Sequence, residues 1–223
     1  MSDNIYNTKV YENAGNLELL ELLPASADGR VLDCGCGAGD NARILSSRGW
    51  KVSGITISPA EREIAAQYCE QVHVANLENG FPQEIQGHYD VIVMSHILEH
   101  LVTPHVLLND AHRLLKSNGL IAVALPNVLH YRQRFEFLLG KFDYAVEGLM
   151  DETHVHFYTF TSGVDLLNRH GYRVLTKLAT GSFPLWKIRK HVPGKWVKQL
   201  NRLACNWKPG FFGYQCIYLA QAN

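Results

Sequence analysis

The chain has 223 residues, of which 47% are hydrophobic and 19% charged, and these proportions exclude a disordered chain, a collagen and a coiled coil. Its 21 basic and 21 acidic residues cancel, but every acid lies within residues 1–165, whereas residues 166–223 carry ten Lys or Arg and no acid. Such a basic end is typical of a surface that meets something anionic. No apolar run approaches the roughly 18 residues of a membrane span, and the polar N-terminus predicts no signal peptide. Five cysteines without a C-x-x-C pair predict reduced thiols and a cytoplasmic protein.

Predicted strands alternate with predicted helices along most of the chain. Runs of apolar and β-branched residues predict strands at 30–34, 51–56, 72–74, 89–94, 120–125, 173–179 and 212–220. Helices are predicted at 42–47 and 161–170, and after the caps Ser58 and Thr103. The helix after Thr103 has an apolar stripe that extends to position 115, and it is expected to end at Asn118 and Gly119. This alternation predicts an α/β fold with a parallel sheet covered on both faces.

A glycine-rich loop, Asp33-Cys34-Gly35-Cys36-Gly37-Ala38-Gly39-Asp40, follows the first predicted strand. In a doubly wound sheet, ligands bind at the carboxyl ends of the strands, and glycines there let the backbone approach a ligand closely. The dinucleotide fingerprint G-x-G-x-x-G needs glycine where Asp40 stands, and a carboxylate at that point would repel a pyrophosphate. The loop therefore favours a nucleoside without phosphates, and a tight turn without a ligand is the alternative.

The residues VLDCGCGAG resemble the first motif of class I S-adenosylmethionine (SAM)-dependent methyltransferases. Further similarities are Gly54-Ile55-Thr56, Asn76-Leu77, SHILEHL at 95–101, the turn at 115–119, and DETHVHFYTF at 151–160. The last segment is similar to small bacterial methyltransferases related to the ubiquinone-biosynthesis O-methyltransferases. The resemblance covers roughly residues 10–180. It implies a Rossmann-like, doubly wound sheet of seven strands, mostly parallel with an antiparallel last strand.

The resemblance also implies which residues hold SAM as co-substrate. The methionine part is expected near Asp33, Gly35, Cys36 and Gly37, the ribose near Thr56 and Ile57, the adenine near Asn76 and Leu77, and the methionine end near Ser95 and His96, with Tyr11 covering the cofactor. Thr56 and Asn76 stand where the family usually has acids. A hydroxyl makes one hydrogen bond where a carboxylate makes two charge-assisted ones, so weaker SAM binding is expected unless Ser58 helps. A Gly-Ile-Thr sequence also resembles cyclopropane fatty acid synthases.

Two histidines are candidates for a general base, which methyl transfer needs only if the acceptor is a hydroxyl that must lose its proton. His154 is the first candidate, because the resemblance places its segment over the mouth of the active site, and His100 is the second. His156 is expected to face the opposite side. A purely structural role in the loop is an equally good interpretation of His154.

The segment from His96 to His100 also matches H-x-x-E-H, a zinc peptidase pattern in which two histidines of one helix share a metal. Here it follows a predicted buried strand in a nucleotide-binding arrangement, and no third ligand is evident. We therefore expect no metal.

A single domain is expected over residues 1–223, because the sequence has no repeat, linker or low-complexity segment. Within it we expect an N-terminal flap at 1–25, a cap rich in aromatic residues over the acceptor site at 126–160, and a basic helical insert between the last two strands at 184–208. Tryptophans alternate with lysines and arginines over 186–207. That pattern fits a solvated surface helix, peripheral contact with an anionic membrane, or a grip on an anionic or phosphate-bearing acceptor, whereas no nucleic-acid motif is present.

The sequence therefore predicts a cytoplasmic SAM-dependent methyltransferase that acts on a small-molecule acceptor, with a hydroxyl oxygen as the favoured target and S-adenosylhomocysteine as product. Three alternatives stay open: a non-catalytic SAM-binding sensor or partner subunit, methyl transfer to a lipid carbon, and methyl transfer to nitrogen. An NAD-dependent oxidoreductase is disfavoured by Asp40. The oligomeric state is not predicted.

Overall fold

The structure is a computed structural model that describes residues 14–25, 28–185 and 190–223. Its strands are β1 (Arg30–Cys34), β2 (Lys51–Thr56), β3 (Gln71–Val74), β4 (Tyr89–Ser95), β5 (Leu115–Pro126), β6 (Tyr172–Gly181) and β7 (Gly213–Ala222). Its helices are α1 (Leu17–Leu20), α2 (Asp40–Ser47), α3 (Pro59–Ala65), α4 (Pro104–Ala111), α5 (Tyr131–Leu138), α6 (Ser162–Arg169), α7 (Gly194–Trp207) and α8 (Pro209–Phe212), with a 3₁₀ turn at Leu77–Asn79.

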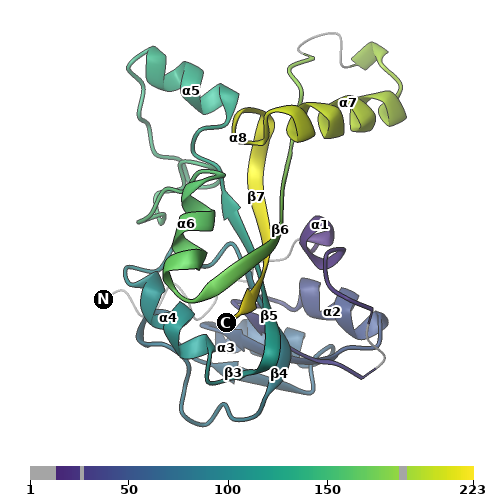
Figure 1. Cartoon of the computed structure of the whole chain (residues 1–223), viewed down its shortest axis with the longest axis vertical. Coiled ribbons are helices and arrows are strands. Elements are labelled where there is room, and N and C mark those ends of the chain that lie inside the picture. Colours follow the sequence, from purple (N-terminus) through teal and green to yellow (C-terminus); the bar gives the residue numbers. More distant parts are fainter. Residues whose placement is uncertain (1–13, 26–27, 186–189) are drawn as a thin grey trace.

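The seven strands form one sheet in the order β3-β2-β1-β4-β5-β7-β6 (Figure 1). Strand β7 runs antiparallel to both β5 and β6, and the pairs from β3 to β5 are parallel. This confirms the predicted fold class. The chain moves outward from β1 to β3 and then returns to the other side of β1 with β4, so a crevice opens at the carboxyl ends of β1 and β4.

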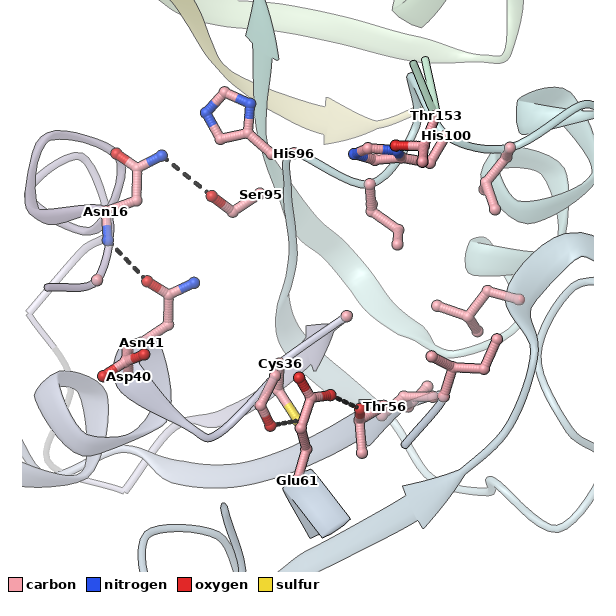
Figure 2. Close-up of a pocket in the computed structure, with 18 of the residues that line it drawn as sticks. Asn16, Cys36, Asp40, Asn41, Thr56, Glu61, Ser95, His96, His100 and Thr153 are labelled. Carbon is pink, nitrogen blue, oxygen red and sulfur yellow. Dashed lines mark hydrogen bonds between the residues drawn. The ribbon is translucent and has the colours of Figure 1, made fainter. Parts of the chain in front are cut away.

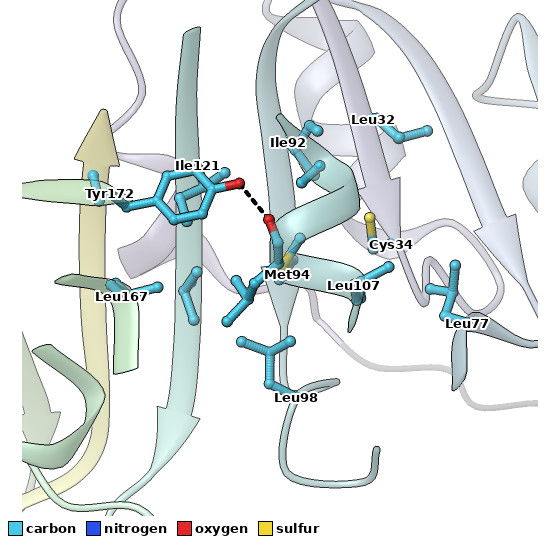
Figure 3. Packing of buried hydrophobic residues seen from close by; sticks show 14 of the residues in the cluster. Leu32, Cys34, Leu77, Ile92, Met94, Leu98, Leu107, Ile121, Leu167 and Tyr172 are labelled. Carbon is cyan, nitrogen blue, oxygen red and sulfur yellow. Dashed lines mark hydrogen bonds between the residues drawn. The ribbon is translucent and has the colours of Figure 1, made fainter. Parts of the chain in front are cut away.

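Side chains alternate between the two faces of the sheet, and helices cover both faces. Leu32 and Met94 point to the face covered by α4 and α6, where Leu107 and Leu167 pack (Figure 3). Tyr172 closes that layer, and its hydroxyl donates to the backbone oxygen of Leu108 over 2.7 Å. The other face is covered by α1 and α2. The alternation of strand residues thus explains why neighbouring apolar residues serve two separate clusters.

The sequence prediction was wrong about the end of one helix. Helix α4 ends at Ala111, and Leu115, predicted as its last apolar position, instead begins β5 and pairs with Tyr89. The register then shifts, and Asn118 has a φ of 64°. The Asn-Gly pair therefore marks an irregularity inside a strand rather than the end of a helix.

The predicted N-terminal flap is packed against the sheet in its described part. Leu19 and Leu20 of α1 are fully buried in the cluster on that face. In the described ranges, no helix is long and apolar enough to cross a bilayer.

Candidate active site

A cavity of about 800 Å³ lies at the carboxyl ends of the parallel strands (Figure 2). The loops after β1, β2, β3 and β4 line it, and β7 and the segment before α1 complete it. Nine residues predicted to hold SAM lie on its wall: Gly35, Cys36, Gly37, Thr56, Ile57, Asn76, Leu77, Ser95 and His96. Asp33 lies beneath it and Tyr11 lies outside the described residues.

The glycine loop needs its glycines for conformation as well as for space. Gly35 and Gly37 have φ values of 69° and 53°, a left-handed region that L side chains rarely adopt. A Cβ at Gly35 would also lie 3.0 Å from Cδ1 of Ile97, which follows β4. The loop is held by the amide of Cys36, which donates to the oxygen of Ile55 over 2.8 Å. The backbone of β1 therefore passes directly under the cavity.

Asp33 is a buried carboxyl group next to this loop. It is fully buried, and neither oxygen makes a hydrogen bond of good geometry among the described residues. Burial raises the pKa of Asp33 to about 7, and the nearby amide of Asn41 moderates the rise. A cation bound above the loop would compensate for the missing partners of this carboxylate.

Thr56 stands at the end of β2, where the resemblance leads us to expect an acid, and a carboxylate from the first turn of α3 lies next to it. The Thr56 hydroxyl donates to Oε2 of Glu61 over 2.5 Å, and both side chains are buried and line the cavity. Ser58 caps α3 by accepting from the amide of Glu61 at 3.4 Å, whereas its own amide donates to the Thr56 hydroxyl. Glu61 therefore turns toward β2 instead of completing the reciprocal capping box.

The electrostatic character of the cavity is acidic. Its lining includes the carboxylates of Glu18, Asp40, Glu61, Glu78 and Asp151, and the described residues contribute no Lys or Arg to it. A ligand with phosphate groups would be repelled by this set of charges, whereas a cationic ligand would be attracted.

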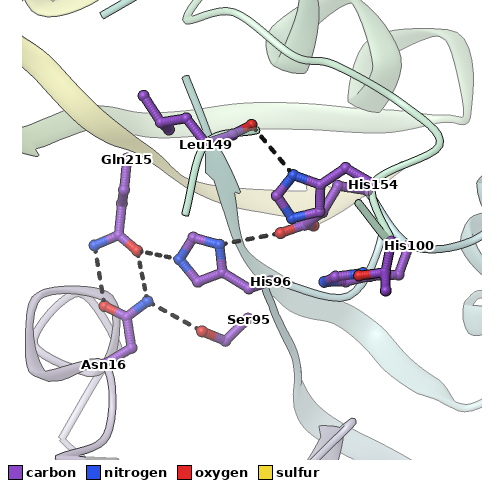
Figure 4. A network of polar contacts seen from close by, with 9 residues as sticks. Asn16, Ser95, His96, His100, Leu149, His154 and Gln215 are labelled. Carbon is purple, nitrogen blue, oxygen red and sulfur yellow. Dashed lines mark hydrogen bonds and ion pairs between the residues drawn. The ribbon is translucent and has the colours of Figure 1, made fainter. Parts of the chain in front are cut away.

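A polar network ties the N-terminal segment to the sheet at one side of the cavity (Figure 4). The side-chain amide of Asn16 donates to the Ser95 hydroxyl (3.0 Å) and to Oε1 of Gln215 (2.8 Å). His96 contacts the same Gln215 oxygen through Nε2 at 2.6 Å and the buried Glu99 through Nδ1 at 3.1 Å. Burial works against protonation, but the carboxylate of Glu99 raises the pKa of His96 above its ordinary value.

His100 lines the cavity and ends a short hydrogen-bond chain. The Thr153 hydroxyl donates its proton to Oδ1 of Asp151 over 2.6 Å, so the same oxygen can only accept from Nδ1 of His100, 2.9 Å away. These directions assign the proton of neutral His100 to Nδ1 and leave a lone pair on Nε2. Burial lowers the pKa of His100, and hydrogen bonds from Thr153 lower that of Asp151 although partial burial opposes them.

His154, the first candidate for the base, stands behind His100 and is not part of the cavity lining. It is 8% exposed, its Nδ1 lies 3.3 Å from the oxygen of Leu149, and its ring meets that of His100 edge-on with centroids 4.7 Å apart. His156 contacts the oxygen of Val102. The structure therefore gives His100 the better access to a bound molecule.

Residues 96–100 form a turn, and His96 has a φ of 54°. The two histidines of the H-x-x-E-H pattern thus do not share a helix face, which removes the geometry of the zinc peptidase alternative. Within the described ranges, one group of side chains could jointly reach a metal ion: ligand atoms of Glu99, His100 and His154 lie within 4.8 Å of one another.

The family of methyltransferase domains matches residues 8–177 of this chain. The chain belongs to that family. Its strand order and glycine loop are those expected for the class I, SAM-dependent type, so the predicted family, fold and co-substrate are confirmed.

Curated relatives include ubiquinone biosynthesis O-methyltransferases. The protein from Acinetobacter baylyi is 33% identical over 96 residues, which cover 40% of each chain. The protein from Pseudomonas aeruginosa is 29% identical over 130 residues, which cover 56% of this chain and 55% of the relative. This methyltransferase chain therefore spans about half the length of the curated relatives it matches.

Solved structures share the fold at low identity. A SAM-dependent methyltransferase from Archaeoglobus fulgidus matches with a TM-score of 0.65 and 18% identity, over 92% of this chain and 91% of the other. The [4+2]-cyclase SpnF matches with a TM-score of 0.60 and 14% identity, over 98% and 87%. Because a cyclase shares this fold, the reaction of this methyltransferase has to be argued from its site.

Several residues of the candidate site were not found from the sequence. Glu61 was interpreted only as part of a helix cap, although its place in the first turn after β2 could have marked it as a substitute acid. Asn16 and Gln215 come from opposite ends of the chain, so no local pattern could join them. No local pattern could join Thr153 and Asp151 to His100 either, because about fifty residues of chain separate them.

Proposed function

We propose that this methyltransferase transfers the methyl group of SAM to a hydroxyl oxygen of a small molecule, with His100 as the general base. The observation that carries the proposal is the chain from Asp151 through Thr153 to Nδ1 of His100, since it leaves Nε2 as an acceptor at a residue that lines the cavity. A hydroxyl acceptor needs such a base, because the oxygen must lose its proton as it attacks.

The residues around the cavity fit SAM. Its cationic sulfonium and ammonium groups suit the acid-rich lining and the buried carboxyl group of Asp33. We assign the Thr56 hydroxyl and the Glu61 carboxylate, with Ile57, to the ribose, and Asn76 and Leu77 to the adenine, because all of them line the cavity. Ser95 and His96, which also line the cavity, are assigned to the methionine end. SAM supplies an activated methyl group, and the protein aligns the acceptor with it and excludes water.

The acceptor follows from the relatives by analogy. Because the curated relatives are named ubiquinone biosynthesis O-methyltransferases, we propose an aromatic hydroxyl of a small molecule as the acceptor. In support, rings gather beyond the cavity: Phe142 stacks near Phe137 and meets Tyr144 and Phe157 at centroid distances of 5.4 to 6.1 Å. Aromatic side chains in such numbers can hold an aromatic ring.

The direct test is transfer of labelled methyl from SAM to a panel of phenols and catechols, with and without an isoprenoid chain. A methyl ether identified by mass spectrometry is the expected product. Methylation confined to nitrogen or carbon would contradict the oxygen target, and SAM binding without any product would favour the non-catalytic alternative.

The test of the base compares three variants at one acceptor. His100→Gln is expected to keep the SAM affinity and lower kcat by about 10²-fold or more. Thr153→Val should lower kcat while Thr153→Ser restores it, because only serine keeps the hydroxyl of the chain. Wild-type kcat should be level at neutral pH and fall only below the ordinary histidine pKa, since burial lowers the pKa of His100 and the neutral form is the base.

A chelator separates proton transfer from metal chemistry at the same cluster. Turnover that is unchanged after treatment with EDTA is expected from the proposed base. Loss with EDTA and recovery with a divalent metal would reassign Glu99, His100 and His154 as ligands.

A further inference from the structure

Helix α7 is a large element that the proposed methyl transfer does not use. It lies between β6 and β7 in the chain and extends from the same end of the molecule as α5 (Figure 1). Its inner side is anchored, since Val197, Ala204 and Cys205 are buried and the last two pack with Phe212 of α8. The helix is thus fixed to the domain, and its outer side is a permanent surface.

The outer side carries an apolar row. Trp196, Leu203 and Trp207 are 53%, 57% and 71% exposed. At about 100° per residue, positions i, i+7 and i+11 of a helix lie within roughly 40° of one another, so these three side chains form one line along α7. Trp207 stacks on the buried Phe212 with centroids 6.2 Å apart, but most of the surface of all three side chains faces solvent.

A basic row runs along another side of the helix, with its centre about 130° around the axis from that of the apolar row. Lys195, Lys198 and Arg202 are exposed on α7 at positions i, i+3 and i+7, which lie within about 60° of one another. No ion pair of the described residues involves any of them. Residues 166–223 contain no acid at all, so nothing in this part of the chain neutralises the row.

The tip of α5 adds apolar surface at the same end. Leu138 is 83% exposed, and Phe135 and Leu139 are also exposed. Tyr131 of α5 contacts α8, which packs against α7, because the Tyr131 ring lies 6.2 Å from that of Phe212. Helix α5 follows β5 directly in the chain, so it leaves the sheet at the carboxyl ends of the parallel strands, where the cavity lies.

We propose that α7, together with the tip of α5, docks the protein on an anionic lipid surface. Tryptophan and leucine side chains enter the interfacial region of a bilayer, while lysine and arginine on the basic row reach the headgroups. A nucleic acid offers negative charge without an apolar layer, and would leave the Trp196–Leu203–Trp207 row uncovered. The proposal is independent of the proposed function, because docking is measured without methyl donor or acceptor.

The test is co-sedimentation of the full chain with vesicles of phosphatidylcholine alone and of phosphatidylcholine with 30% phosphatidylglycerol. Binding to the anionic vesicles is expected, with a loss as salt increases. Two triple variants probe the rows: Trp196→Gln, Leu203→Gln, Trp207→Gln, and Lys195→Gln, Lys198→Gln, Arg202→Gln. Each is expected to weaken binding by about tenfold or more.

Matched variants elsewhere on the surface control for charge and hydrophobicity in general. Arg43→Gln, Lys51→Gln, Arg62→Gln removes three exposed cations, and Val74→Gln, Val102→Gln, Leu175→Gln removes three exposed apolar residues. Both should bind as the wild type does, and equal melting temperatures should show that all four variants are folded.

Several results would overturn the proposal. These are equal binding to neutral and anionic vesicles, no binding to either, or no change in the α7 variants. Binding to RNA that competes with vesicles and needs only the basic row would make the partner a nucleic acid. A dimer that the apolar variant abolishes, with vesicle binding unchanged, would assign the row to a second copy of the chain.

Discussion

Burial shifts the pKa values of Asp33 and His100, two side chains of the candidate site, in opposite directions, because it disfavours the charged form of each. Asp33 is placed by a motif, and its buried position follows from the strand that carries it. His100 is a candidate from its residue type, but its choice over His154 depends on which side chain lines the cavity. The partner that assigns its proton, Thr153, becomes visible only when the chain is folded.

The raised pKa of Asp33 predicts a stability that falls with pH. The unfolded chain releases this proton near the ordinary pKa of 3.8, whereas the folded protein holds it until about pH 7. Unfolding therefore releases a proton between these values, and the free energy of unfolding decreases as pH rises through that window. This shift of about three pH units corresponds to about 4 kcal/mol in the free energy of unfolding. That contribution is present below the ordinary pKa of 3.8 and is fully lost above pH 7.

Asp33→Asn removes this dependence on pH. In urea unfolding, the free energy of unfolding of the variant relative to that of the wild type should therefore increase from pH 5 to pH 8. Asp165→Asn, an exposed carboxylate on α6, is the control and should follow the wild type. A constant difference between Asp33→Asn and wild type across that range would contradict the assignment.

Among the elements, short buried strands were the most predictable and connections the least. The bounds of β1 and β2 agree with the prediction to the residue, because β1 is followed directly by Gly35 and β2 ends two residues before the helix cap Ser58. The end of α4 was missed since Leu115 fits both an apolar helix stripe and the buried start of β5. The spacing of apolar residues alone cannot distinguish the end of a helix from the start of a buried strand at this position.

The first turn of α3 supplies the carboxylate at the end of β2, and this predicts a specific loss of SAM affinity. Glu61→Gln keeps the shape and the cap but removes the charge, so the Kd for SAM should rise about tenfold or more, as for a lost hydrogen bond to a charged group. Glu63→Gln is the control, because that residue is exposed on the same helix and pairs with Arg62. Titration calorimetry measures both, and equal Kd values for the two variants would contradict the role of Glu61.

Across the whole molecule, charge is divided between the two parts of the chain. Residues 1–165 carry all 21 acids, five of which line the cavity, and residues 166–223 carry only bases. This division was evident from the sequence. Its meaning was not, because only the fold shows that the acids gather around a cavity while Lys195, Lys198 and Arg202 lie on one outer helix face.

The acidic lining has a consequence for the replacement of the product S-adenosylhomocysteine by a new molecule of SAM. Methyl transfer turns a positively charged sulfonium into a neutral thioether, so each turnover weakens the attraction that holds the nucleoside among the carboxylates. The protein should therefore prefer SAM to S-adenosylhomocysteine at low ionic strength. That preference should shrink as salt increases, and the ratio of the two Kd values measured between about 50 and about 500 mM salt tests it, because the Debye length shortens over this range. A ratio that does not change would mean that the lining does not sense the charge. A ratio that falls with salt would mean that the loss of the sulfonium charge itself helps the product to leave.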